Sequence, residues 1–365
     1  MTEATTKLFK TRTSRRSILK GLGVAAIGIS LSGKKYPAWA AEEPKLNLYN
    51  WDTYIGETTL EDFKNASGID VNMSLFATND ELFAKLRAGN PGFDVIVPGS
   101  EFVERMIQAN MLEPLDHAKI PNIKNVSPEF INDAPYDPGR KYSMPYTWLV
   151  IGIGYRKSKV KSTPDSWKVL FDSDEYKGRI AVMSDASELF RNCFKYLGHS
   201  LNDKSPELLK QAEALLIKQK PNIKSFHEDN GQDLLASGEV DVVMEYNGDI
   251  AQVMAEDDDL NFVVPKEGAM KQSDTLAIPK GAPHPENALA FINFILDAKV
   301  GAEISETIKY PSPNAAAVAL MPASYKDNPV IFPPADLMAK CEYPNYLGPE
   351  YSRMLEEAMT RLRAA

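Results

Sequence analysis

The stretch KLNLYNWDTYIGETTLEDFKNASGIDVNMSLF, residues 45–76, decides the fold. It predicts a strand over 45–49, an amphipathic helix over 58–66 and a second strand over 69–76. Gly68 comes just past the expected helix end, where glycine readily takes the left-handed conformation that closes a helix. A strand, a helix and a strand in this order indicate a βαβ unit with parallel strands.

The same alternation continues along the chain. Asn79 is placed to cap a helix over 81–88, a buried type of strand follows over 93–97, and Ser100 is placed to cap a helix that ends at 108. Further strands are predicted over 148–155, 179–183, 240–246, 262–264 and 275–278, and further helices over 187–197, 206–220, 249–255 and 285–296. The last fifth of the chain is expected to be helical with proline-rich joints. This rhythm predicts an α/β protein in which helices cover both faces of a parallel sheet.

The residues that follow the predicted strands share one chemistry. Ligands of open α/β sheets bind at the carboxyl ends of the strands, so these positions are candidates for a site. Acids and aromatics recur there, whereas lysine and arginine are nearly absent. The residues are Trp51, Asp52 and Tyr54, then Gly99, Ser100 and Glu101, then Asp185 and Glu188, and finally Asn247 and Asp249.

Acids combined with aromatics are typical of a site for an organic cation. An aliphatic amine has a pKa near 10 and stays charged at neutral pH. Carboxylates balance that charge, while aromatic faces attract the cation and cover its methylene groups, each contact contributing about 0.5–2 kcal/mol. A buried charge without any such partner would cost far more than that.

The first forty residues are expected to be an export signal rather than part of the fold. Residues 14–20, SRRSILK, form a twin-arginine motif, and a short apolar stretch over 21–31 follows it. Residues 38–40, AWA, match the small-x-small pattern of signal peptidase, so the mature chain should begin near Ala41 in the periplasm. The alternative is an N-terminal membrane anchor, although the apolar run is short for a bilayer span.

Charge and size narrow the class of protein. The forty-residue segment holds eight basic residues and one acid, so its removal changes the formal net charge from −9 to −16. So acidic a chain is a poor candidate for nucleic acid or anionic membrane and suits a cationic ligand. The remaining 325 or so residues exceed the size at which a single core keeps growing, so two lobes are expected. The two cysteines, Cys193 and Cys341, could pair in an oxidising compartment, but we favour two buried thiols.

No motif for catalysis, metal binding or a cofactor stands out. The sequence holds no HExxH, no GxSxG, no phosphate-binding loop and no GxGxxG after a strand. The glycines of Gly152-Ile153-Gly154 lie inside an apolar strand and are best explained by packing. The four histidines lack metal-ligand spacing and are interpreted as helix-end or surface residues: His117, His199, His227 and His284. We therefore expect no enzyme activity, no cofactor and no metal.

Asp185 and Glu188 have two interpretations, one functional and one structural. They could serve acid–base chemistry or bind a ligand, or they could form a capping box at the start of a helix. No nucleophile or metal set accompanies them.

Seven motifs together resemble one family. They are LYNWDTYIG (48–56), GFDVIVPG (92–99), MPYTW (144–148), DASELF (185–190), EYNGD (245–249), VPKEGAM with DTLAIP (264–279), and ETIKYPSPN (306–314). In register along almost the whole mature chain, they resemble the spermidine/putrescine-binding proteins of polyamine ABC importers. The resemblance implies the periplasmic-binding-protein fold, with two α/β lobes, a hinge and a ligand cleft. It also implies discontinuous lobes, one made of 41–148 and 273–318 and the other of 149–272 and 319–365.

The resemblance implies a set of ligand-binding residues. Trp51 and Tyr54 match aromatics that sandwich the polyamine, Asp185 and Glu188 fall on an acidic pair, and Tyr246 stands where the family usually has a tryptophan. Asp249 matches an acid of putrescine-type members, and Asp274 matches the acid that binds one ammonium near the hinge. Tyr310 matches another aromatic residue that lines the cleft.

The sequence also departs from the family pattern. Gly99 replaces a usual serine, with Ser100 beside it, and Gln272 replaces an aromatic lid residue. The family places a hydroxyl residue and then an acid after the tryptophan, whereas Asp52 here precedes Thr53. Tyr343 offers an aromatic near a late contact, but Pro344 stands where spermidine binders have a glutamine.

Three functions are weighed. The first is a periplasmic receptor that captures putrescine or spermidine by hinge closure and presents it to a membrane permease. It would be a monomer with no nucleic-acid partner and no membrane insertion after signal cleavage. The second is the same fold binding another cationic or amino-acid-derived solute, in which case Arg191 is the nearest candidate for a carboxylate partner, although a solvated surface position is the simpler reading of that residue. The third is an enzyme that uses Asp185 and Glu188.

Overall fold

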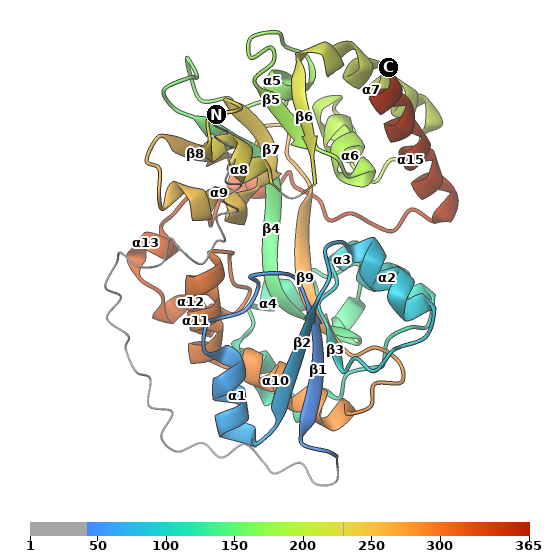
Figure 1. The fold of residues 1–365 in the computed structure, drawn as a ribbon, viewed down its shortest axis with the longest axis vertical. Coiled ribbons are helices and arrows are strands. Elements are labelled where there is room, and N and C mark those ends of the chain that lie inside the picture. The colour runs from blue at the N-terminus through green and yellow to red at the C-terminus, as the bar shows by residue number, and fades with distance from the viewer. Residues whose placement is uncertain (1–41, 229) are drawn as a thin grey trace, which may run out of the picture. The chain divides into compact units, whose positions relative to one another are not determined.

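The chain begins its fold with the expected βαβαβ alternation (Figure 1). A computed structural model describes residues 42–228 and 230–365, and the predicted export signal lies outside them. The first elements are β1 (Lys45–Asn50), α1 (Thr59–Ser67), β2 (Asp70–Leu75), α2 (Asn79–Arg87), β3 (Val95–Ile96) and α3 (Ser100–Gln108). Strand β1 pairs in parallel with both β2 and β3, as predicted.

Two of the three predicted helix ends differ in detail from the prediction. Gly68 closes α1 with φ of 79°, as expected. Helix α2, however, is capped by Thr78, whose hydroxyl accepts from the Glu81 amide, so the prediction that Asn79 caps it is wrong. Ser100 is likewise the first residue of α3 and not its cap, because Gly99 occupies that position.

Two long strands connect the two halves of the molecule. Strand β4 (Ser143–Arg156) pairs along 143–150 with β9 (Lys271–Ala277) and then changes partners. From Ile151 onward it pairs antiparallel with β7 and β8. The two strands run vertically between the upper and lower halves in Figure 1. The sheet is therefore mixed and not purely parallel, because both crossing strands run antiparallel to their neighbours.

The second half repeats the α/β architecture. Its elements are α5 (Lys168–Phe171), β5 (Ile180–Met183), α6 (Ala186–Tyr196), α7 (Pro206–Gln219), β6 (Ile223–His227), α8 (Gly231–Ala236), β7 (Val242–Tyr246), α9 (Asn247–Met254) and β8 (Leu260–Val263). Strand β5 pairs in parallel with β6 and β7. Across the described residues the strands follow the order β2-β1-β3-β9-β4-β7-β5-β6, with β8 on β4.

The remaining helices complete both halves. They are α4 (Pro128–Asn132), α10 (Pro285–Ile295), α11 (Ala298–Ile308), α12 (Ala315–Leu320), α13 (Ala323–Lys326), α14 (Ala335–Met338) and α15 (Pro349–Ala364). Helix α15 packs against α6 and α7 at the far end of the second half (Figure 1). The last fifth is helical with proline-rich joints, as predicted.

Buried positions confirm two sequence expectations and correct one. Cys193 and Cys341 are both free thiols in buried positions. The glycines of the 152–154 run are packing residues, because a Cβ at Gly152 would lie 2.4 Å from Phe262. The prediction for His227 is wrong, since its ring lies inside β6 with only 3% of the residue exposed.

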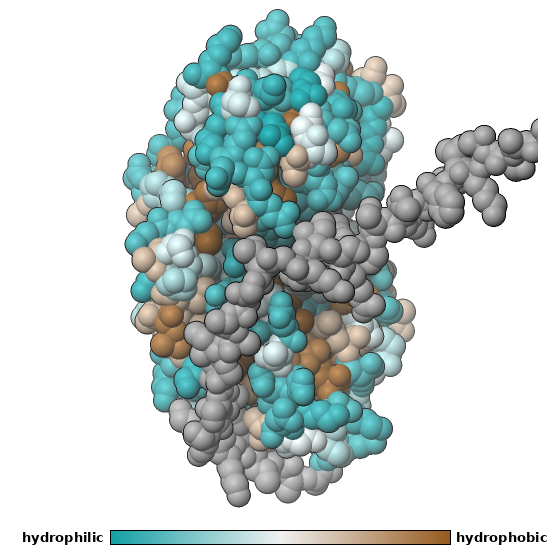
Figure 2. Space-filling model, turned by 60° about the vertical axis from the view of Figure 1, so that its left-hand side comes forward, coloured by the Kyte–Doolittle hydropathy of each residue, from teal (hydrophilic) through white to brown (hydrophobic). Residues whose placement is uncertain are grey.

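Hydrophilic residues cover most of the face shown in Figure 2, with small hydrophobic patches between them. Within residues 42–228 and 230–365, no helix is both long and apolar enough to cross a membrane.

Candidate functional site

A buried carboxylate lies where the two halves join. Asp274 on β9 is 8% exposed, and its Oδ2 accepts a hydrogen bond of 2.8 Å from the Tyr54 hydroxyl. The same hydroxyl lies 2.6 Å from Oγ1 of Thr147 on β4. Burial raises the pKa of Asp274 to about 6, while the hydrogen bonds from Tyr54 and Thr147 lower it. The carboxylate is thus held in place by hydroxyl groups that carry no charge.

Tyrosine rings surround this carboxylate. The Tyr54 ring meets the ring of Tyr310 edge-on at 5.2 Å and that of Tyr146 at 5.6 Å. A Cβ at Gly248 would lie 2.5 Å from the Tyr310 ring, so only glycine fits there. Burial, followed by the neighbouring Asp249 carboxylate, raises the pKa of Tyr310. Asp249 in the first turn of α9 therefore belongs to the same cluster as Tyr310 and Tyr54.

A second carboxylate lies at the other end of the junction. Oε1 of Glu188 on α6 accepts hydrogen bonds from the hydroxyl of Tyr246 and, at 3.1 Å, from the Gln272 amide. Burial and then the Asp185 charge raise the pKa of Glu188 to about 8, although both hydrogen bonds act in the opposite direction. We call Tyr54, Glu188, Tyr246, Asp249, Gln272, Asp274 and Tyr310 the acidic site.

Strand β9 links the two carboxylate groups. Gln272 and Asp274 are two positions apart on this strand, so their side chains project from the same face. The backbone at Gly99 faces both of them, because a Cβ there would lie 3.4 Å from Gln272 Oε1 and 3.5 Å from Asp274 Oδ1. The site thus draws on α6 and β7 of the second half, on the β1 tip of the first half and on the shared strand β9.

The turn after β1 contributes unequally. The Trp51 indole donates a hydrogen bond of 2.9 Å to the Val97 carbonyl, and its ring packs on Phe76 at 4.3 Å. Asp52 and Thr53 are exposed on the turn, and Thr53 has φ of 53°. Among the described residues, no hydrogen bond joins Asp52 to the acidic site.

Asp185 is a helix cap. Its side chain is exposed at the surface and accepts a hydrogen bond of 2.9 Å from the Glu188 amide at the start of α6. The capping interpretation of this residue is confirmed. Its charge still acts on Glu188, as the raised pKa of that carboxyl indicates.

Two candidates, Ser100 and Tyr343, make no hydrogen bond to the acidic site among the described residues. The Ser100 hydroxyl is fully buried and has no hydrogen-bond partner among the described residues. Tyr343 is buried against Tyr136, with ring centroids 5.7 Å apart, and the Lys271 ammonium lies 4.6 Å from its ring centroid. Tyr343 therefore packs in the core of the first half.

Arg191 contradicts the expectation of a solvated surface position. Its side chain is 0% exposed. Nε donates to the Leu201 carbonyl, Nη1 to Glu101 and Ser187, and Nη2 to Asn202 and the Asn345 carbonyl. Because these groups occupy the guanidinium, Arg191 offers no free fork for a ligand carboxylate.

Sequence reasoning missed Thr147 and Tyr146. The Tyr146 hydroxyl donates a hydrogen bond of 2.7 Å to the Tyr54 carbonyl and so holds the β1 tip. Both residues lie in the MPYTW motif, but the predicted strand began one residue later, at 148. The motif itself was the available signal.

Two carboxylates of the acidic site, Asp274 and Glu188, have no positively charged partner within the described residues. Within the described residues, neither Asp274 nor Glu188 pairs with a lysine or an arginine, and no cluster of metal-ligating side chains occurs. Buried carboxylates without a cation are costly to ionise, and a cation from outside would reverse that cost. The arrangement suits a bound organic cation with aromatic contacts.

Comparisons with known proteins agree with this geometry. Residues 58–333 match the family model described as bacterial extracellular solute-binding protein. The chain is 33% identical over 362 residues to the putrescine-binding periplasmic protein SpuD of Pseudomonas aeruginosa, covering 94% of this chain and 98% of the relative. It is 34% identical over 348 residues to the spermidine/putrescine-binding periplasmic protein of Salmonella typhimurium, covering 95% and 97%.

A solved structure shares the fold. The putative spermidine/putrescine ABC transporter from Listeria monocytogenes superposes with a TM-score of 0.83 at 33% identity, covering 88% of this chain and 99% of that one.

The chain belongs to the bacterial extracellular solute-binding proteins. Its fold is the two-lobed α/β fold of the periplasmic solute-binding proteins, as expected. Proteins of this class bind a solute for an ABC transporter and do not convert it, so the chain is a binding protein and not an enzyme.

Proposed function

We propose that this protein captures a polyamine in the periplasm and delivers it to an ABC importer. The observation that carries the proposal is a pair of carboxylates, the buried Asp274 and the partly buried Glu188, which among the described residues have hydroxyl and amide partners but no lysine or arginine. A polyamine supplies the missing positive charge at both ends and a methylene chain for the rings between them. The names of the relatives, which bind putrescine or spermidine, support the same ligand class.

Each part of the acidic site has a proposed role. Asp274, with Asp249 behind Tyr310, holds one ammonium, and Glu188 holds the other with the charge of Asp185 nearby. The methylenes lie against aromatic rings, which are Trp51, Tyr54, Tyr246 and Tyr310. Gln272 orients Glu188 through its amide. No direct contact is proposed for four candidates, because Asp52 and Thr53 are exposed on the turn, Tyr343 packs on Tyr136, and the Ser100 hydroxyl makes no hydrogen bond to the acidic site among the described residues.

Binding is proposed to close the two lobes about a hinge. The lobes comprise 41–148 with 273–318, and 149–272 with 319–365. The change of partners along β4, between Val150 and Ile151, and the start of β9 at Lys271 support boundaries near these positions. A ligand that contacts both lobes stabilises the closed state by its differential affinity for that state.

The cellular context is part of the proposal. The twin-arginine motif would export the folded chain, which then acts as a monomer and presents its ligand to a membrane permease. A diamine such as putrescine is the favoured ligand, since Asp249 matches putrescine-type relatives and Pro344 replaces the glutamine of spermidine binders.

The proposal is tested with ligand-stripped protein. The protein is unfolded, dialysed and refolded, and its thermal stability is measured with putrescine, cadaverine, spermidine and agmatine. At 100 times the dissociation constant, a true ligand should stabilise the fold by about 2.7 kcal/mol. Mass spectrometry of the untreated protein should show a diamine that leaves unaltered. The absence of any shift with all four amines would refute the polyamine assignment.

Another cationic solute is the second candidate, because Gly99 and Gln272 give this site a different lining. Choline and an amino-acid amide in the same panel test it, since both are cations without a carboxylate. A ligand carboxylate is not supported, since the donors of Arg191 are taken by protein groups.

A further inference from the structure

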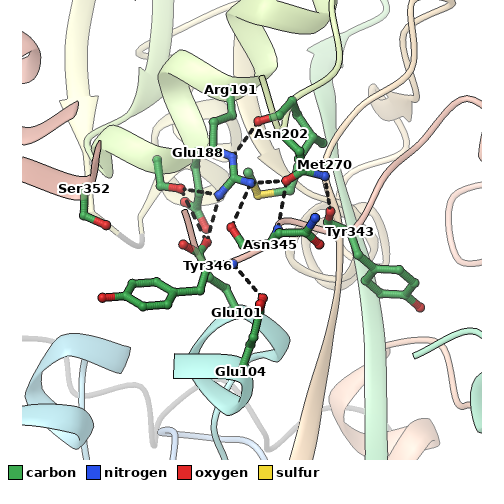
Figure 3. A network of polar contacts seen from close by, with 12 residues as sticks. Glu101, Glu104, Glu188, Arg191, Asn202, Met270, Tyr343, Asn345, Tyr346 and Ser352 are labelled. Carbon is green, nitrogen blue, oxygen red and sulfur yellow. Dashed lines mark hydrogen bonds and ion pairs between the residues drawn. The ribbon is translucent and has the colours of Figure 1, made fainter. Parts of the chain in front are cut away.

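A buried arginine lies directly between the two halves, outside the acidic site (Figure 3). Arg191 belongs to α6, which follows β5 in the second half. Its side chain is 0% exposed and makes hydrogen bonds with all three nitrogens. Most of those partners, such as Leu201 and Asn202, lie close by in sequence. Only one partner carries the opposite charge.

That partner comes from the other half. Glu101 belongs to α3, which follows β3, and its Oε2 lies 3.1 Å from Arg191 Nη1. The Ser187 hydroxyl, one turn before Arg191 on α6, lies 3.5 Å from the same oxygen. The ion pair therefore connects α3 of the first half with α6 of the second half.

A second carboxylate of the same helix reaches across as well. Glu104 is three positions after Glu101, so both lie on one face of α3. Its Oε2 accepts a hydrogen bond of 2.7 Å from the Tyr346 amide. The neighbouring Asn345 is tied to Asn202, which in turn binds Arg191. Figure 3 shows the two glutamates meeting this network from below.

The energetic asymmetry of the contact favours the closed arrangement. Arg191 keeps its neutral partners whether or not α3 is near, but it loses its ion pair with Glu101 when α3 moves away. A buried charge whose partner is removed is strongly unfavourable, unless water can reach it. Opening the lobes brings water to Arg191 and hydrates its charge. The ion pair therefore contributes to the stability of the closed state and not to that of the open state. Burial also raises the pKa of Glu101 to about 7, although the Arg191 charge acts in the opposite direction.

We propose that Glu101 and Glu104 form a latch that holds the lobes closed through Arg191 and the Tyr346 amide. The latch sets the fraction of ligand-free protein that is closed and the rate at which a bound ligand leaves. The apparent affinity of a ligand falls in proportion to the population of the competent state, so weakening the latch weakens binding without any lost ligand contact. The ligand arm of this inference rests on the proposed function, whereas the conformational arm does not.

The test uses spin labels on the exposed residues Asp70 and Lys210, one in each half, in otherwise wild-type ligand-free protein. Pulsed electron–electron double resonance gives the distribution of distances between the two spin labels, and so between the halves. Glu101→Gln removes the charge with almost no change of shape and should shift the distribution toward longer, open distances. Glu101→Asp keeps the charge but shortens the reach and should shift it in the same direction by a smaller amount. Circular dichroism confirms that each variant is folded.

The second readout is the dissociation rate of putrescine by stopped flow. We expect Glu101→Gln to increase it about 10- to 100-fold, in keeping with the cost of leaving a buried charge unpaired. The matched control is Glu213→Gln, which removes a carboxylate paired with Arg361 between α7 and α15 inside the second half. This control should leave both the distances and the rate unchanged.

Each outcome of these measurements either supports or refutes the latch. If Glu101→Gln and Glu101→Asp both keep the wild-type distances and rate, the latch does not exist. If only Glu101→Gln changes the rate, with unchanged distances, Glu101 acts on the ligand through its charge alone and the latch is again refuted. If the wild-type protein binds no amine but the distances still lengthen in both variants, the proposed function fails and the latch stands.

Discussion

Glu188 on α6 and Glu101 on α3 are carboxylates on opposite sides of the junction between the two halves. They differ in whether the protein supplies a cation to them. Burial raises the pKa of both carboxyls, to about 8 for Glu188 and about 7 for Glu101. Glu101 pairs with the guanidinium of Arg191, whereas within the described residues the Glu188 carboxylate accepts hydrogen bonds from Tyr246 and Gln272 and has no lysine or arginine partner. The protein thus supplies its own cation to the contact that joins the lobes. It leaves the acidic site to a cation from solution.

The largest effect is expected at Asp274. Asp274→Asn removes the carboxylate on the crossing strand β9 and should weaken putrescine binding by at least about 100-fold. A loss of this size is expected when one partner of a buried charged hydrogen bond is removed. Isothermal titration calorimetry measures the loss. Asp165→Asn is the matched control, because it removes an exposed carboxylate that pairs with Lys266.

The same variant should be more stable than wild type without ligand. The folded pKa of Asp274, about 6, lies above its unfolded value, so the ionised group destabilises the ligand-free fold above that pH. The gain in unfolding free energy should therefore be present at pH 7 and should vanish toward pH 4. A ligand-free variant that is less stable at pH 7 would contradict this description of the site.

Glu188→Gln should have a smaller effect on affinity, about 10-fold at pH 7. Glu188 with a pKa near 8 is mostly protonated at pH 7, so a ligand must first displace its proton. Wild-type affinity for putrescine should accordingly rise between pH 6 and pH 8, while the amine stays charged. Calorimetry in two buffers of different ionisation enthalpy should reveal proton release on binding. Affinity that rises equally steeply in the variant would exclude Glu188 as the titrating group.

Tyr54→Phe should weaken binding by about 3- to 10-fold. The change keeps the ring that packs on Tyr310 but removes the hydroxyl that donates to the Asp274 carboxylate. A hydrogen bond to a charged group typically contributes about 1.5–3 kcal/mol, and we expect only part of it to be lost from binding because the Thr147 hydroxyl still supports the carboxylate. Tyr176→Phe in the second half is a suitable control. Loss of all binding in Tyr54→Phe would indicate that the hydroxyl contacts the ligand itself.

The smallest effect is expected at Asp52. Asp52→Asn should change affinity by less than about twofold, since this residue is exposed on the turn after β1 and exposed charges contribute little. Fluorescence of Trp51 during a putrescine titration gives the comparison. A large loss would place the Asp52 carboxylate on the ligand in the closed state.

The sequence predicted the elements whose patterns are local. The βαβαβ start, the strand tips with Trp51, Tyr54 and Glu188, and the cap formed by Asp185 all follow from short-range periodicity and capping chemistry. Strand β4 begins five residues before the predicted start at 148, and it accommodates Pro145 beside a bulge between Pro145 and Thr147. Strand β6 (IKSFH) and helix α8 were missed as well, because each is too short to show a period.

Long-range contacts could not be predicted. Arg191 looked like a surface residue because nothing within its own helix shows that Glu101, ninety positions earlier, covers it. The packing of Tyr343 could not be predicted either, because its partner, Tyr136, lies 207 positions earlier in the chain. In both cases the environment is created by the joining of the two halves, which leaves no local pattern in the sequence.

The most direct test of the central claim is a titration of ligand-stripped wild-type protein with putrescine at pH 8, alongside the double variant Asp274→Asn/Glu188→Gln. We expect saturable 1:1 binding to the wild type and no measurable binding to the double variant at the same concentrations. Equal binding to both proteins would contradict the claim that two buried carboxylates without a cation of their own define the site.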